Sequence, residues 1–191
     1  MVISGPSGVG KSTVVRRLFK IYPELKMSVS TTTRSPRPGE AHGQSYFFIT
    51  QEEFDLRVRQ EKFLEWAKVH GSCYGTPRDY IDKELSSGAV VVLEVDVQGA
   101  AAIKRTVEAG ELKAAAVFVF LIPPSVDILA FRLKKRKTED EEVVNYRLRA
   151  AIAELQVMEK YDYIVVNDKV ESAADKIRAI INVEKERTLI N

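Results

Sequence analysis

The stretch GPSGVGKST, from Gly5 to Thr13, gives the strongest indication of the fold of the chain. It satisfies the pattern G-x-x-x-x-G-K-S, with a strand-like segment before it, Met1 to Ser4, and a helical apolar stripe after it, Lys11 to Ile21. Glycines allow the backbone to wrap closely around phosphate oxygens, and the start of a helix presents its positive end to the same anion. We therefore predict a phosphate-binding loop at the end of a first strand.

Two residues of the loop have distinct predicted roles in binding a nucleotide. Lys11 supplies a mobile positive charge for the β and γ phosphates, and the Ser12 hydroxyl is the predicted ligand for Mg²⁺. The motif alone leaves GTPase, ATPase, kinase and motor activities open. The loop residues predicted to bind the nucleotide, which the family resemblance described below implies is ATP, are Gly5, Ser7, Gly8, Val9, Gly10, Lys11, Ser12 and Thr13.

Composition sets the broad class of protein. The chain has 191 residues, 45% hydrophobic and 29% charged, which is typical of one soluble globular domain. Its net charge of +2 predicts neither a nucleic-acid nor a membrane partner. The single Cys73 predicts no internal disulfide and a reducing compartment, the cytoplasm, or an organellar matrix if a targeting peptide once preceded the short first strand.

Strand and helix patterns alternate along the chain. Two nearly continuous apolar runs, AVVVLEVDVQG and AVFVFLIPP, suit strands covered on both faces. Helical patterns follow them, at about 98–108 and from Ser125 onward, and again at 140–160 and 170–187. This order predicts an α/β fold with a parallel sheet flanked by helices.

A second group of residues suits a phosphate acceptor. Arg34 and Arg37 lie in a proline-rich turn and can clamp one phosphate dianion, with a further hydroxyl from Tyr46. Glu65, between apolar neighbours, can accept hydrogen bonds from the N1 and N2 edge of guanine, which adenine does not offer. Asp96 follows a buried strand, at the edge where ligands bind in such sheets. A solvated basic turn and an exposed strand glutamate are the alternatives for these positions.

Arginines in the second half of the chain suit the transfer of a phosphoryl group. Arg132 and Arg136 are four residues apart and share one helix face, and Arg147 lies on the next helix. Such cations stabilise the negative charge that spreads over a phosphoryl group in transfer. A solvated helix end, or a nuclear-import tract in RLKKRK, is the alternative interpretation.

Over nearly its whole length, the chain resembles the guanylate kinases. The resemblance rests on the loop and on segments in the family's order and spacing: SVSTTTRSPRPGE, YFFIT, FLEWAKVHGSCYGTP, VLEVDVQGA, LIPPS, RLKKRK, NYRLRAAIAEL and IVVND. It implies transfer of the γ phosphate of ATP to GMP with Mg²⁺ and no covalent intermediate. It also implies a P-loop core at about 1–32, 78–124 and 161–191, a mixed α+β GMP-binding insert at about 33–77 and a helical lid at about 125–160.

The resemblance assigns individual residues. Catalytic roles fall to Lys11, Arg34, Arg132 and Arg147. ATP-binding residues beyond the loop are Arg132, Arg136, Asn167 and Asp168. GMP-binding residues are Ser30, Arg34, Arg37, Glu40, Tyr46, Glu65, Tyr74, Gly75, Thr76 and Asp96, while Glu94 stays unassigned.

Two other functions compete with the kinase. Scaffold proteins carry guanylate-kinase-like domains that bind phosphopeptides without catalysis, although the intact loop argues against that use here. Another P-loop phosphotransferase or a hydrolytic switch is the second competitor, and Glu65 and Thr76 argue against it. The expected substrates are ATP and GMP, with dGMP as a further candidate acceptor, and the chain is expected to act as a monomer or homodimer.

Overall fold

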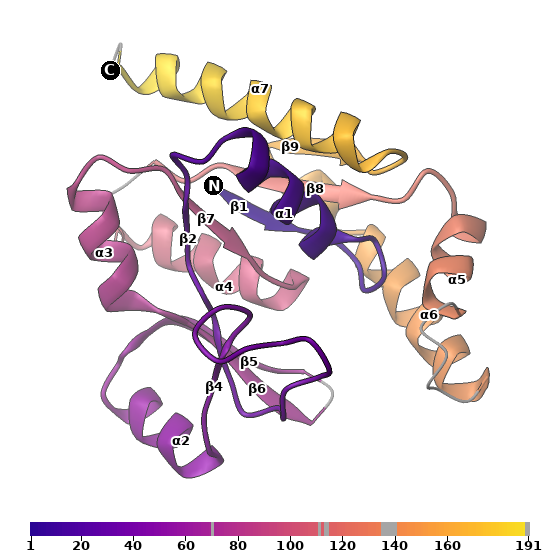
Figure 1. Cartoon of the computed structure of the whole chain (residues 1–191), viewed down its shortest axis with the longest axis horizontal. Helices are drawn as coiled ribbons and strands as arrows, with labels where there is room; N and C mark the ends of the chain where they lie inside the picture. The colour runs from indigo at the N-terminus through magenta and orange to yellow at the C-terminus, as the bar shows by residue number, and fades with distance from the viewer. Residues whose placement is uncertain (70, 111, 113–114, 135–140, 190–191) are drawn as a thin grey trace. The chain divides into compact units, whose positions relative to one another are not determined.

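The computed structural model describes residues 1–69, 71–110, 112, 115–134 and 141–189 (Figure 1). By their internal contacts they form two compact units, and each is described by itself. Unit 1 comprises Met1–Glu24, Glu94–Val97 and Ala115–Asn191. Unit 2 comprises Leu25–Leu93 and Gln98–Ala114.

Unit 1 contains the phosphate loop. Its elements are β1 (Val2–Ser4), α1 (Lys11–Ile21), β8 (Phe118–Ile122), α5 (Val126–Lys134), α6 (Glu141–Leu155), the short 3-10 helix η1 (Met158–Lys160), β9 (Tyr163–Val166) and α7 (Val170–Leu189). Strands β1, β8 and β9 pair in parallel in that order. The loop leaves the carboxyl end of β1, where parallel α/β sheets bind their ligands.

The core of unit 1 explains its apolar runs. All three residues of β1 are buried, and so are Phe118 to Leu121 of β8, because helices cover the sheet. Helix α7 runs beside α1 and β9 and buries Ala173, Ala174 and Ile177 (Figure 1). Ser125 caps α5 as its position predicts, since the Ile128 amide donates to its hydroxyl at 3.2 Å.

Unit 2 combines a mixed sheet with three helices. Its elements are β2 (Lys26–Met27), β3 (Thr31–Thr32), β4 (Phe47–Phe48), α2 (Gln51–Arg59), β5 (Phe63–Val69), β6 (Ser72–Pro77), α3 (Arg78–Ser86), β7 (Val91–Glu94) and α4 (Val97–Glu108). The last residue of β7, Glu94, and the first residue of α4, Val97, belong to unit 1. Strands β4, β3, β6 and β5 form one sheet in that order, in which β5 and β6 are an antiparallel pair. Strand β2 pairs in parallel with β7.

A small aromatic cluster holds α2 against this mixed sheet. Phe54 of α2 is completely buried and stacks on Phe63 of β5, with ring centroids 4.6 Å apart. Cys73 of β6 completes the cluster as a buried free thiol. The cluster fixes β5 and β6, which carry several of the predicted site residues.

The predicted fold class is confirmed, since parallel strands alternate with helices that flank them. Two element lengths differ from the sequence-based expectation. The helix predicted up to Lys160 ends at Leu155, where the Gln156 amide bonds to the Ala153 carbonyl and tightens the last turn. The segment QSYFFIT, whose aromatic and β-branched residues favour a strand, forms one only at Phe47–Phe48. Among the described residues, no helix is long and apolar enough to cross a membrane.

Candidate functional site

The phosphate loop of unit 1 has a backbone that favours glycine at two positions. Gly8 and Gly10 have φ angles of 83° and 97°, in the left-handed region. A Cβ atom at Gly8 would meet a Leu133 methyl carbon at 2.7 Å, and one at Gly10 would meet the Asn167 amide nitrogen at 2.8 Å. The loop is therefore fitted closely against α5 and the end of β9.

Lys11, at the start of α1, bridges the loop from inside. Its ammonium donates to the Gly5 carbonyl at 2.5 Å and to the Pro6 carbonyl at 3.2 Å. These bonds hold the positive charge over the first turn of the loop. A charge held there faces the backbone that is predicted to bind phosphates.

Ser12 contacts an acid that the sequence left without a role. Its hydroxyl donates to Glu94 Oε1 at 2.5 Å, and Glu94 is the last residue of β7. Burial raises the pKa of Glu94, and the Ser12 hydrogen bond and the charges of Lys11 and Arg16 offset part of that rise. The hydroxyl and the carboxylate form a pair of hard oxygen donors, the kind of ligands that Mg²⁺ prefers.

Asp96 lies two residues beyond Glu94, and its charge acts on Tyr161. Burial is the main cause that raises the pKa of Tyr161, and the charges of Asp96 and Glu154 raise it further. Asp96 is thus placed among polar groups at the carboxyl end of the strands. Its predicted role toward GMP stays a prediction.

Arg132 of α5 is anchored to the loop. Its guanidinium donates to the Val9 carbonyl at 3.1 Å and to the Asn167 carbonyl at 3.0 Å. The Asn167 side-chain amide, itself buried, donates to the same Val9 carbonyl at 2.7 Å. The structure thus brings Arg132 and Asn167 to the loop, while Asp168 is exposed beside them. Arg136 lies outside the described residues.

Helix α6 reaches the loop through two side chains, of which the sequence predicted only one. Arg147 donates to the Ser7 hydroxyl at 2.9 Å. The Ser7 backbone amide donates to Glu154 Oε2 at 3.1 Å. The seven-residue spacing from Arg147 to Glu154 puts both on one helix face and was the only sequence signal for Glu154.

In unit 2, two predicted phosphate ligands meet around a carboxylate. Arg34 donates through one nitrogen to both Glu40 oxygens at 3.0 Å, and the Arg37 amide donates to Glu40 Oε2 at 2.7 Å. Burial acts to raise the pKa of Glu40, but the bonds from Arg37 and Arg34 outweigh it and lower the pKa below its ordinary value. The turn is therefore an organised group of charges, not a loosely solvated one.

Aromatic rings support this group of charges. The Arg34 guanidinium carbon lies 5.5 Å from the centre of the Tyr46 ring, within range of a cation–π contact. Tyr46 and Tyr74 meet edge to face, with centroids 5.9 Å apart. The three predicted residues Arg34, Tyr46 and Tyr74 thus lie together.

The predicted base-reading residues form a second group in the same sheet. Glu65 of β5 and Thr76 of β6 are cross-strand partners, and the Thr76 hydroxyl donates to Glu65 Oε1 at 2.5 Å. Both are buried, with exposed fractions of 8% and 1%. Gly75 lies under the Phe63 ring, where a Cβ atom would be 2.8 Å from a ring carbon. The Ser30 carbonyl accepts the Phe47 amide at 2.9 Å.

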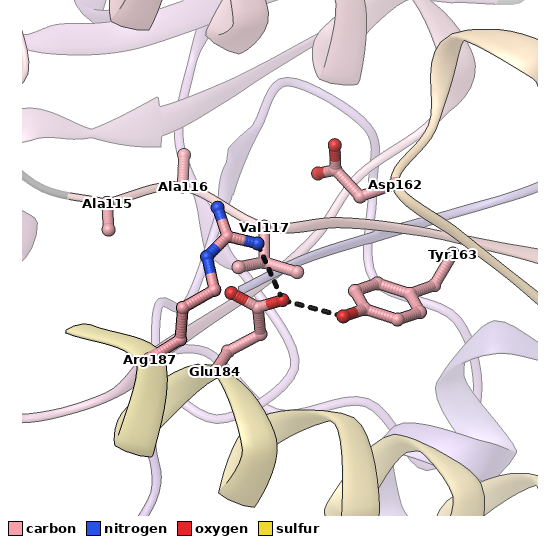
Figure 2. Close-up of a pocket in the computed structure, with 7 residues that line it drawn as sticks. All are labelled: Ala115, Ala116, Val117, Asp162, Tyr163, Glu184 and Arg187. Atoms are coloured by element: carbon pink, nitrogen blue, oxygen red, sulfur yellow. Dashed lines mark hydrogen bonds and ion pairs between the residues drawn. The ribbon is translucent and has the colours of Figure 1, made fainter. Parts of the chain in front are cut away.

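Each unit also has a cavity with a lining of its own. In unit 1, a cavity of about 530 Å³ is lined by residues that include Tyr163, Glu184 and Arg187. The Glu184 carboxylate accepts hydrogen bonds from the Tyr163 hydroxyl and the Arg187 guanidinium (Figure 2). It includes none of the predicted site residues. In unit 2, an open hollow of about 680 Å³ is bordered by Glu65 and Arg78.

Comparisons with known proteins point to one family. A family model described as guanylate kinase matches residues 1–184. The guanylate kinase of Caldanaerobacter subterraneus subsp. tengcongensis is 48% identical over 185 residues, which cover 97% of this chain and 87% of that protein. The guanylate kinase of Desulfitobacterium hafniense is 44% identical, and the matched part covers 97% of this chain and 90% of that protein.

A solved structure agrees as well. The crystal structure of guanylate kinase from Anaplasma phagocytophilum superposes with a TM-score of 0.77 at 32% identity, covering 96% of this chain and 84% of that chain. The resemblance found in the sequence is thereby confirmed. The chain belongs to the guanylate kinase family.

Proposed function

We propose that this protein transfers the γ phosphate of ATP to GMP, giving ADP and GDP, and that unit 1 binds ATP while unit 2 binds GMP. Membership of the guanylate kinase family supports the reaction. The observation that carries the choice of acceptor is the buried Glu65 carboxylate, held at 2.5 Å by Thr76. A fixed acceptor of this kind suits the two N–H groups that guanine presents on one edge.

The donor half of the proposal rests on the phosphate loop. Its amides and Lys11 are the proposed phosphate ligands. Arg132 and Arg147 already lie against the loop, where their charges can stabilise the phosphoryl group in transfer. The Asn167 side-chain amide donates to the Val9 carbonyl at 2.7 Å and so helps to fix the loop.

Ser12 and Glu94 are the proposed residues for Mg²⁺. Their oxygens lie 2.5 Å apart and are of the hard type that this ion prefers. When bound, the ion neutralises charge on the β and γ phosphates. We assign Glu94, in preference to Asp96, to this role because Glu94 is the one whose carboxylate contacts the loop hydroxyl.

The acceptor half rests on the charges around Glu40. Arg34 and Arg37 are the proposed ligands of the GMP phosphate, assisted by the hydroxyls of Tyr46 and Tyr74. Glu40 holds Arg34 in position before GMP arrives, which reduces the entropy lost on binding. Arg34 then orients the phosphate oxygen for attack.

The chemical step needs few protein groups. An oxygen of the GMP phosphate attacks the γ phosphorus, the bond from that phosphorus to the bridging oxygen breaks, and ADP leaves with the electron pair. The GMP phosphate is already largely ionised near neutral pH, because the second pKa of such groups is about 6. Positioning and charge stabilisation are therefore sufficient, and no strong base is assigned.

The remaining parts of the proposal concern organisation and location. We retain the division into a core, a GMP-binding insert at about 33–77 and a lid at about 125–160. A cytoplasmic location suits the buried free thiol of Cys73. Action as a monomer or homodimer, and use of dGMP, belong to the same proposal.

A substrate comparison tests the function directly. With ATP and Mg²⁺, we expect kcat/KM for GMP to exceed that for AMP, CMP and UMP by at least about 100-fold, because only guanine satisfies Glu65. A coupled assay of ADP formation measures this ratio. A preference for AMP or UMP would contradict the assignment of the base-reading residues. Phosphopeptide binding without turnover would favour the scaffold alternative.

Glu65→Gln tests the base-reading role. The variant loses a charged acceptor for guanine, so we expect the KM for GMP to rise at least about tenfold, while the KM for ATP stays within about twofold. Steady-state kinetics with each substrate varied measures both constants. Glu52→Gln, an exposed glutamate on α2 of the same unit, serves as the control. Equal rises in both KM values would refute the role.

Glu94→Gln tests the buried acid by its effect on stability. Because the folded pKa of Glu94 is raised, the folded protein binds more protons than the unfolded chain in a pH window. This window extends from about pH 4.5, the ordinary pKa of the group, up to the folded pKa. The Glu94 contribution to the free energy of unfolding therefore falls as pH rises through this window, and levels off above the folded pKa.

We expect Glu94→Gln to gain stability relative to the unmodified protein as pH rises above about 4.5, and to bind Mg²⁺-ADP more weakly. Urea unfolding at several pH values and calorimetric titration measure the two effects. Glu159→Gln, at an exposed position of η1, is the control and should show neither. A stability difference that does not vary with pH would contradict the raised pKa.

A further inference from the structure

Helix α6 contacts one residue of the phosphate loop with two opposite charges. Arg147 donates to the Ser7 hydroxyl at 2.9 Å, and the Ser7 amide donates to the Glu154 carboxylate at 3.1 Å. The two charged residues are seven positions apart, about two helical turns, so their side chains converge on Ser7 from one face. Arg147 was expected at the site, but Glu154 was not.

Attachment of α6 does not depend on the Glu154 contact. Val144 and Ala151 of α6 are buried with Leu129 and Leu133 of α5, and Leu148 packs against the same cluster. Burial of several apolar side chains stabilises the packing of two helices more than one partly exposed hydrogen bond does. The bond from Ser7 to Glu154 therefore has its main effect on the loop.

The Ser7 amide finds its acceptor outside the loop. The glycines around it give the loop many accessible conformations, so a bond from a distant element restricts the backbone strongly. A hydrogen bond to an ionised carboxylate is about twice as strong as one between neutral groups. The bond to Glu154 thus orients the peptide group between Pro6 and Ser7, and with it the first half of the loop.

We propose that Glu154 is a positioning residue of the ATP site: through the Ser7 amide it fixes the first half of the phosphate loop in the conformation that binds the nucleotide. Together with Arg147, which donates to the Ser7 hydroxyl, it also links the position of α6 to that of the loop. This inference rests on the proposed function of the loop. It assigns Glu154 no direct contact with substrate.

Binding of Mg²⁺-ADP, measured by calorimetry without any acceptor, tests the inference. We expect Glu154→Ala to weaken binding about tenfold, the effect of losing one hydrogen bond to a charged group. Glu154→Gln keeps an oxygen acceptor at the same place and should restore affinity to within about threefold. Glu142→Ala, at an exposed position of the same helix, should leave affinity unchanged.

Steady-state kinetics adds a readout that a purely structural role would not move. The KM for ATP should rise in Glu154→Ala while the KM for GMP stays within about twofold. In combination with Arg147→Ala, the loss of affinity should be smaller than the product of the two single losses, because both act on Ser7. A loss of affinity in the double variant equal to the product of the two single losses would contradict the inference that both residues act on Ser7.

Three other results would overturn the inference. They are unchanged Mg²⁺-ADP affinity in Glu154→Ala, equal rises in both KM values, and tighter binding, which would mean that the carboxylate competes with phosphate. Because the calorimetric arm needs no GMP, it is independent of the proposed transfer. Absence of GMP turnover in the unmodified protein would count against the proposed function alone.

Discussion

The glycine loop fits so closely against its surroundings that its shape governs the whole proposed ATP site. A side chain at Gly8 or Gly10 would collide with Leu133 or Asn167, so only a bare backbone can follow this path. The same path turns the Val9 carbonyl toward the Arg132 guanidinium. The shape of the loop thus determines where the positive charges around it can be anchored.

Carboxylates hold the polar groups of both proposed half-sites in place. Glu94 holds the Ser12 hydroxyl and Glu154 holds the Ser7 amide in unit 1, while Glu40 holds Arg34 in unit 2. Groups that are already oriented lose less entropy when a substrate binds, and they need no rearrangement as charge develops. For a reaction that depends on positioning, this is the chemical contribution expected of the protein.

The sequence was informative where chemistry depends on neighbours along the chain. The loop motif located the predicted phosphate site, and the apolar runs located β7 and β8. The sequence could not identify Glu154, whose partner Ser7 is 147 residues away. The contact of Glu94 with Ser12 likewise joins residues 82 positions apart, and a single sequence does not encode such a contact in a readable pattern.

The proposed mechanism requires that each nucleotide bind to its own unit. Hydrogen exchange followed by mass spectrometry, with GMP alone and with Mg²⁺-ADP alone, can test this requirement, because amide exchange slows where a ligand orders the backbone. We predict that GMP slows exchange in peptides spanning 30–46 and 65–76, and that Mg²⁺-ADP slows exchange in peptides spanning 5–13. Slowing of the same peptides by both nucleotides, or of the loop by GMP alone, would show that the two units do not divide the substrates in this way.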